Sequence, residues 1–200
     1  MLSGLPTDAD GHFIGSPWIW VNGSSLVVAL TLIQGYVLIG STYLILKTSG
    51  ELQQRHVRTA RLAAATTLGG ALLITVTSPF VSETLRSRLF DPAFLPFFVL
   101  LPLLGIALIV QLFRSLALGQ EVWPFVYTVL LFVLSFAGLG VMVFPAIIPP
   151  SVTIFEASSS VTSMVFMLTF IGVLIPIMLF YNIYNYIAFS GKVDAELDQA

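Results

Sequence analysis

The sequence predicts an all-α fold, a polytopic membrane bundle of five transmembrane helices. Hydrophobic residues make up 57% of the 200 residues, charged residues make up 9%, and the mean hydropathy is +0.98. Soluble domains carry about 25% charged residues, so this composition excludes a water-soluble globule and a disordered chain. The net charge of −2 leaves no basic surface for nucleic acid.

Five stretches have the length that a helix needs to cross the hydrocarbon, about 20 mostly apolar residues. They are apolar at both odd and even positions, unlike barrel strands, and helices satisfy their own backbone in lipid. The expected spans are Leu26–Leu46, Leu62–Val81, Phe94–Phe113, Val122–Ile147 and Thr162–Phe189. We therefore expect an outer N-terminal segment at 1–22, the five-helix bundle at 23–189 and a cytoplasmic tail at 190–200.

The basic residues predict the orientation, because cytoplasmic loops are enriched in Lys and Arg. On the expected outer side of the membrane, the only basic residues are Arg86 and Arg88. The expected cytoplasmic side has Lys47, Arg55, Arg58, Arg61, Arg114 and Lys192. The N-terminus is therefore expected outside and the C-terminus in the cytoplasm.

No catalytic residue or metal site is expected on this chain. It has no cysteine, and the expected spans contain no Asp, Glu, Lys, Arg or His. Such intramembrane groups usually mark proton relays and ion pathways, so their absence argues against a proton-coupled transporter. No nucleophile elbow, phosphate loop or zinc signature is found.

Haem ligation can be judged from the same residues, since axial ligands are mostly His, Met, Cys or Tyr. His12 lies in the outer segment and His56 in the basic loop, so neither is expected within a span. Methionines in apolar helices are more often packing residues. We expect no haem on this chain.

Four residues are candidates for a partner interface or a proton path. Gln34, the polar residue deepest in a span, could bond to another helix or bind a carbonyl-bearing ligand. Arg55 and Arg58 lie in the basic loop 50–61, which could attract anionic lipid or dock a partner loop. Glu156, in the last outer loop, could pair with a partner's base, carry protons, or be a capping or solvated acid.

Small residues predict where helices approach closely. The second span has Ala63, Thr67 and Ala71 at a spacing of four, and Thr66 and Gly70 at the same spacing. The fourth span has Ser135, Gly138 and Gly140. In the loop that follows, Pro149 and Pro150 are expected to end the fourth helix, and Ser160 or Thr162 to cap the fifth.

Four segments together resemble a known family. They are the opening 4–15, the stretch 35–54 ending in Lys-Thr-Ser-Gly-Glu-Leu-Gln-Gln, the segment 151–158 reading Ser-Val-Thr-Ile-Phe-Glu-Ala-Ser, and the tail 176–193. In this order they resemble the second half of subunit II of cytochrome bd quinol oxidase, nearest to its cyanide-insensitive branch. The likeness covers essentially the whole chain.

Two features depart from that family's pattern. The family's subunit has more spans, in two related halves, so this chain would be a fragment, a split gene product or the result of a wrongly assigned start. In addition, Phe155 and Glu156 replace the usual Trp-Asp pair. The acid is kept at this position, but the side chain of Glu156 is one methylene longer than that of aspartate.

The resemblance implies that this chain acts as one subunit of a protein complex in the inner membrane of a bacterium. Haems b and d would lie in a larger partner subunit, which oxidises quinol and reduces oxygen to water. This chain would be a haem-free subunit, able to hold a structural quinone, and could meet a separate N-terminal half or a small accessory subunit. Two alternatives stay open: a small transporter or channel, and an assembly protein without a redox role.

Overall fold

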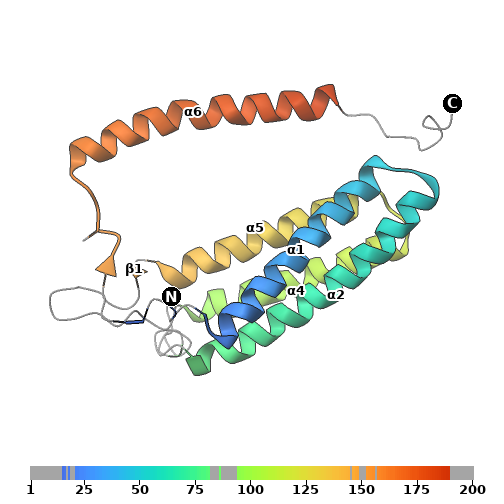
Figure 1. The fold of residues 1–200 in the computed structure, drawn as a ribbon, viewed down its shortest axis with the longest axis horizontal. Coiled ribbons are helices and arrows are strands. Elements are labelled where there is room, and N and C mark those ends of the chain that lie inside the picture. Colours follow the sequence, from blue (N-terminus) through green and yellow to red (C-terminus); the bar gives the residue numbers. More distant parts are fainter. Residues whose placement is uncertain are drawn as a thin grey trace.

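The computed structural model describes residues 15–16, 18, 21–81, 86, 94–144, 146–148, 152–155 and 157–189. Within them lie five helices that are long and apolar enough to cross a membrane, which confirms the predicted all-α fold. The helices are α1 (Gly23–Lys47), α2 (Gly50–Val81), α4 (Leu95–Ala117), α5 (Trp123–Val143) and α6 (Val161–Ala188) (Figure 1). Strands β1 (Ala146–Ile148) and β2 (Val152–Thr153) pair in antiparallel fashion between α5 and α6.

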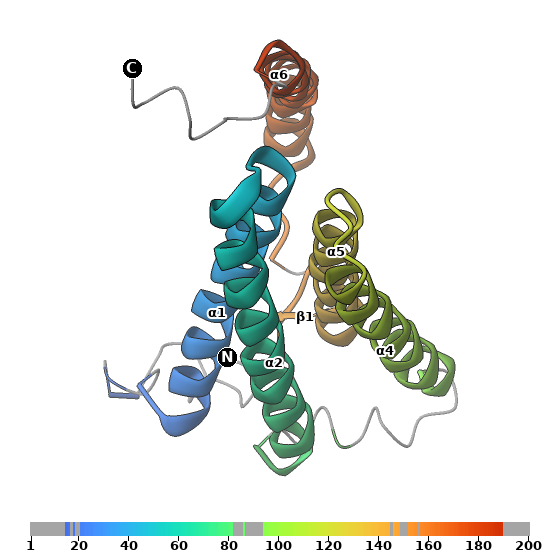
Figure 2. The same cartoon turned by 90° about the vertical axis from the view of Figure 1, so that its right-hand side faces the viewer.

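Four of the helices form two hairpins that lie side by side (Figure 2). Helix α1 contacts both α2 and α5, and α4 contacts α5. The buried apolar core is Leu38, Ile45, Ala60, Ala63, Ala64, Leu112 and Leu116. These residues lie in the half of the bundle that is nearest the two short turns, where α1 meets α2 and α4 meets α5.

Helix α2 begins earlier than expected, and this corrects the prediction of a basic loop at 50–61. Those residues form the first three turns of the helix, so His56 is also helical. The segment contains good helix formers and no proline. A 32-residue helix is about 48 Å long, longer than the hydrocarbon core, so hydropathy marks where lipid begins and not where the helix begins.

Helix α5 ends at Val143, four residues before the expected Ile147, with Phe144 as its C-cap. Pro145 follows, and the residue before a proline is driven out of the helical region, as the ψ of 137° at Phe144 shows. Residues 146–148 extend as β1. The stop therefore comes before the pair Pro149-Pro150, whereas Ser160 caps α6 as predicted.

One residue from each predicted row of α2 is closely packed, and Gly70 meets α1. Ala63 is 1% exposed, and a Cβ built on Gly70 would overlap the side chain of Thr31. Thr66 and Ala71 are exposed. Because a helix has 3.6 residues per turn, residues spaced by four shift progressively around the helix axis, so not all of them can face the same neighbouring helix. In α5, Gly138 lies beside Leu101 of α4, whereas Ser135 and Gly140 are exposed.

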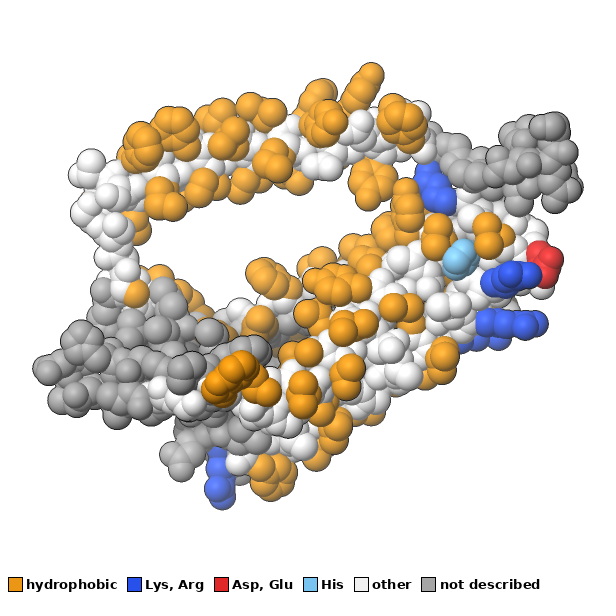
Figure 3. All heavy atoms as spheres, viewed as in Figure 1, with side chains coloured by type: hydrophobic (Ala, Val, Ile, Leu, Met, Phe, Trp, Pro, Cys, Tyr) orange, Lys and Arg blue, Asp and Glu red, His pale blue; other side chains and the backbone are white. Residues whose placement is uncertain are grey.

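Helix α6 lies apart from the other four helices. None of its residues is buried, and Figure 3 shows an open space lined with hydrophobic side chains between α6 and the rest. Contacts near its C-terminal end join it to α1. The ring of Tyr186 meets that of Tyr43 edge-on at 6.2 Å, and the Lys47 Nζ donates to the Phe189 carbonyl oxygen at 3.2 Å.

Candidate functional site

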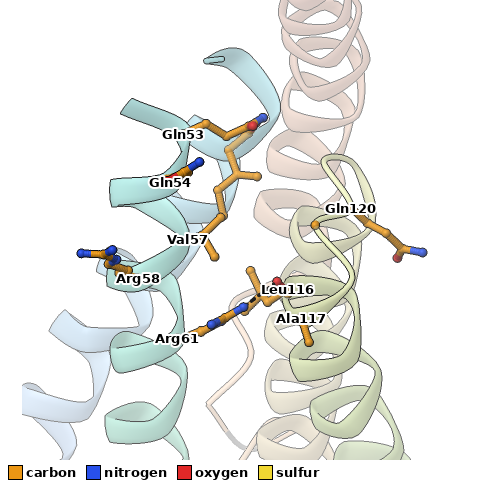
Figure 4. Close-up of a pocket in the computed structure, with 10 residues that line it drawn as sticks. Gln53, Gln54, Val57, Arg58, Arg61, Leu116, Ala117 and Gln120 are labelled. Atoms are coloured by element: carbon orange, nitrogen blue, oxygen red, sulfur yellow. Dashed lines mark hydrogen bonds between the residues drawn. The ribbon is translucent and has the colours of Figure 1, made fainter. Parts of the chain in front are cut away.

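A polar pocket lies at the tightly packed end of the bundle, between the first turns of α2 and the end of α4 (Figure 4). Its volume is about 400 Å³. It is lined by Ile45, Gln53, Gln54, Val57, Arg58, Arg61, Leu116, Ala117, Gly119 and Gln120. Two arginines and three glutamines therefore contribute to the lining or the rim of one cavity where the membrane spans end, and Arg61 reaches across it (Figure 4).

Gln53 forms the inner wall of this pocket. Its amide nitrogen donates to the carbonyl oxygens of Ile45 and Thr48, both at 3.0 Å, and to the Glu121 carboxylate at 3.1 Å. One side chain thus connects the end of α1, the start of α2 and the turn before α5. This network fixes the wall and pairs the Glu121 carboxylate with an amide.

Arg61 crosses the pocket from α2 to α4 (Figure 4). Its Nη2 donates a 2.9 Å hydrogen bond to the carbonyl oxygen of Leu116, in the last turn of α4. The last four carbonyls of a helix have no partner within that helix, and a cation is stabilised near its C-terminus. A guanidinium has five N–H donors, so several of those of Arg61 remain available.

The rim of the pocket has polar side chains that make no side-chain hydrogen bond to any residue the structure describes. They are Gln54, Arg58 and Gln120. Gly119 gives the turn at the rim its shape, because its φ of 67° lies in the left-handed region that other residues rarely adopt. The site offers hydrogen-bond donors and positive charge.

The three predicted site residues that the structure describes, Gln34, Arg55 and Arg58, do not come together. Arg58 lines the pocket, but Arg55 forms an exposed ion pair with Glu51, at 3.1 Å, one turn earlier. Gln34 lies half-buried in the middle of α1 and makes no hydrogen bond to the described residues. Glu156 lies outside the described residues, so its predicted roles stay predictions.

Four of the polar residues in this pocket were not predicted as site residues: Gln53, Gln54, Arg61 and Gln120. Gln54, Arg58 and Arg61 are spaced i, i+4 and i+7, which places them on one face of a helix. That signal was hidden because the segment was expected to be a loop. Nothing in the local sequence signals Gln120, which the turn after α4 brings to the same rim.

The described residues contain no group of three or more His, Cys, Asp or Glu that could hold a metal ion. The pocket likewise has no thiol or carboxylate among its lining residues. The lining therefore consists of guanidinium, amide, backbone and apolar groups.

Comparison with known protein families shows which family has this sequence pattern. The sequence pattern described as cytochrome bd terminal oxidase subunit II matches residues 1–189. The chain belongs to the cytochrome bd subunit II family. The resemblance found in the sequence is thereby confirmed for the family, and with it a membrane protein of helices.

Curated relatives of this subunit II chain include cytochrome bd-I ubiquinol oxidase subunit 2 of Escherichia coli K12. The two are 24% identical over 229 aligned residues, covering 98% of this chain and 60% of the relative. The proteins of the same name from strains O6:H1 and O157:H7 match to the same extent. The chain therefore spans about 60% of the length of these relatives.

Proposed function

We propose that this chain is a haem-free membrane subunit, or half-subunit, of a bd-type oxidase that transfers electrons from quinol to oxygen. The match of residues 1–189 to the subunit II family carries this proposal. The relatives' printed name, a ubiquinol oxidase subunit, supports the reaction class. The larger partner would hold haems b and d, and no active site is assigned to this chain.

The distribution of histidine supports a haem-free role. The chain has only His12 and His56. His56 lies in the polar first turns of α2, in the segment that also carries Arg55, Arg58 and Arg61. The long apolar parts of the described helices therefore offer no imidazole for axial ligation.

The exposed surface supports a protein partner. No residue of α6 is buried within this chain, and its exposed side chains are large and apolar along its length. The buried core is confined to one half of the four other helices. Lipid or other helices must cover the remaining surface, and a larger haem-bearing subunit would provide such helices.

Finer assignments rest on the resembling segments. We place the chain with the second half of the family's subunit, in the cyanide-insensitive branch, on the likeness of the segments 4–15, 35–54 and 151–158. A structural quinone and a separate N-terminal half or small accessory subunit belong to the same proposal. The residues Gln34, Arg55, Arg58 and Glu156 remain candidates for partner contact or proton passage.

The proposed location is the bacterial inner membrane, with the N-terminus outside. The charge distribution supports it, because Lys47, Arg114 and the basic start of α2 all lie at the turn end of the bundle. The cysteine-free sequence allows a direct check. Gln120→Cys, in the turn after α4, should react with a membrane-impermeant maleimide only after the membrane is opened, whereas Ser24→Cys should react in intact cells.

The function is tested by purifying the tagged full chain from its native membranes in mild detergent. We expect a larger subunit to co-purify, and a reduced-minus-oxidised absorbance spectrum to show haem bands. Membranes that contain the untagged chain provide the control. A colourless preparation without a partner would contradict the proposal, and solute uptake by liposomes containing the chain alone would favour a transporter.

A further inference from the structure

We propose that the pocket between α2 and α4 binds the phosphate-bearing headgroup of an anionic membrane phospholipid. This inference rests on the pocket and the membrane spans, and does not depend on the oxidase function. The pocket's charge, its position at the ends of the spans and the apolar surface beside it all point to the same ligand class.

The charge of the pocket favours an anion. Arg58 and Arg61 contribute two positive charges, and the amides of Gln54 and Gln120 add neutral donors, whereas the Gln53 amide already donates to three oxygens. The nearby Glu121 carboxylate already accepts a hydrogen bond from Gln53 in the wall. Charge-assisted bonds from guanidinium to phosphate are shorter and about twice as strong as neutral bonds, so phosphate gains more here than a neutral headgroup.

The two arginines have different parts in this site. Arg61 is fixed across the cavity by its bond to the Leu116 oxygen and can present its remaining N–H groups. Arg58 projects from the outer side of α2 at the rim (Figure 4). It has no hydrogen bond or ion pair with the described residues, so nothing there prevents it from turning over the mouth of the pocket.

The position of the pocket favours a lipid over a soluble anion. Its lining includes Ile45 near the end of α1 and Leu116 and Ala117 at the end of α4, so it lies at the depth where the hydrocarbon gives way to headgroups. Leu62, next to Arg61 in α2, is 67% exposed, and Leu118 is 63% exposed. These side chains offer an apolar surface for acyl chains directly beside the basic pocket.

The test is native mass spectrometry of the full chain, stripped of lipid in detergent and titrated with phosphatidylglycerol or phosphatidylcholine. We expect the first phosphatidylglycerol to bind more tightly than phosphatidylcholine. Arg58→Gln should lower the affinity for this first phosphatidylglycerol about fivefold, which is the effect expected of one basic residue at the membrane surface. Arg58→Lys should retain most of the affinity.

Arg55→Gln is the matched control, because it removes the same charge one turn earlier from a residue that does not line the pocket. We expect it to leave the first binding step almost unchanged. Equal losses for Arg55→Gln and Arg58→Gln would indicate diffuse attraction to a basic surface and would overturn the site. Equal affinity for the two lipids would overturn it as well.

Two further experiments distinguish a lipid phosphate from a soluble phosphate, and a lipid ligand from a protein ligand. Inorganic phosphate should not displace phosphatidylglycerol, and effective displacement would show that the ligand is a soluble anion. A photo-crosslinking amino acid at Gln54 should give a phospholipid adduct in native membranes. A peptide adduct instead would show that a protein occupies the pocket, and would overturn the lipid assignment.

Discussion

The ammonium of Lys47 donates a 3.2 Å hydrogen bond to the carbonyl oxygen of Phe189, and so joins the C-terminal ends of α1 and α6. The two residues are 142 positions apart in the chain. The end carbonyls of a helix have no partner within the helix and carry its negative dipole end. Lys47 therefore neutralises two helix ends at once, its own and that of α6.

Lys47→Met should free the end of α6, because methionine keeps the length of the side chain but removes the donor. Spin labels at Leu44→Cys in α1 and Tyr184→Cys in α6 can report the distance between the helices in this cysteine-free chain. We expect Lys47→Met to broaden and lengthen the distance distribution. Lys47→Arg should preserve it, and an unchanged distribution with Met would show that Lys47 does not hold α6.

Gly70→Ala should destabilise the contact between α1 and α2. The added Cβ would overlap Thr31, and overpacking costs about 1–3 kcal/mol. Gly69→Ala is the control, since nothing lies within 4 Å of its Cβ position. In detergent unfolding by SDS, Gly70→Ala should unfold earlier than the native chain and Gly69→Ala should not. Equal stability of the two variants would contradict the close approach.

Thr67→Val should leave the free energy of unfolding unchanged or raise it, whereas most substitutions of a buried residue lower it. The Thr67 hydroxyl is buried and has no hydrogen-bond partner among the described residues. An unpaired buried polar group costs about 1–3 kcal/mol, and valine removes it at nearly the same volume. The same unfolding assay measures the effect.

The control for that change is Thr128→Val in α5. Thr128 is 0% exposed and donates a 2.8 Å bond to the Pro124 carbonyl oxygen. Losing this bond should destabilise the chain by about 1 kcal/mol. A loss of stability in Thr67→Val as large as in Thr128→Val would mean that the Thr67 hydroxyl has a partner, in lipid or in another subunit.

Arg61→Met should loosen the contact between α2 and α4, because the bond to the Leu116 oxygen is lost. We expect the free energy of unfolding to fall by about 1 kcal/mol, less than the roughly 1.5–3 kcal/mol of a buried bond from a charged donor, because the Arg61 side chain is exposed to water. Arg55→Met is the matched change. Its ion pair with Glu51 is 72% and 83% exposed, so its loss should cost about 0–0.5 kcal/mol.

The spans were predictable because hydropathy reports the environment of each residue, one residue at a time. The expected span Leu26–Leu46 lies within α1, and Thr162–Phe189 differs from α6 by one residue at each end. The predicted helix ends were wrong where hydropathy carries no information about the backbone conformation. The polar start of α2 is helical outside the hydrocarbon, and a single proline after Phe144 ends α5.

The candidate site was predicted less well, because it depends on which residues meet. Arg58 was selected from the sequence, but the other residues that line the pocket come from α1, α2, α4 and the turn after α4. Gln34 and Arg55 were selected with it, and both lie elsewhere. The pocket forms where segments distant in the sequence meet at the ends of the spans, so no local pattern predicts its lining.

By itself, the sequence determined the class of protein and the number of spans, because both follow from how much apolar chain must leave water. It also carried the family's pattern along residues 1–189. Only the tertiary structure decided which small residues touch, that α6 lies apart, and that Gln53 and Arg61 join three helices around one pocket. These contacts depend on helix rotation and register between distant segments, which no local pattern specifies.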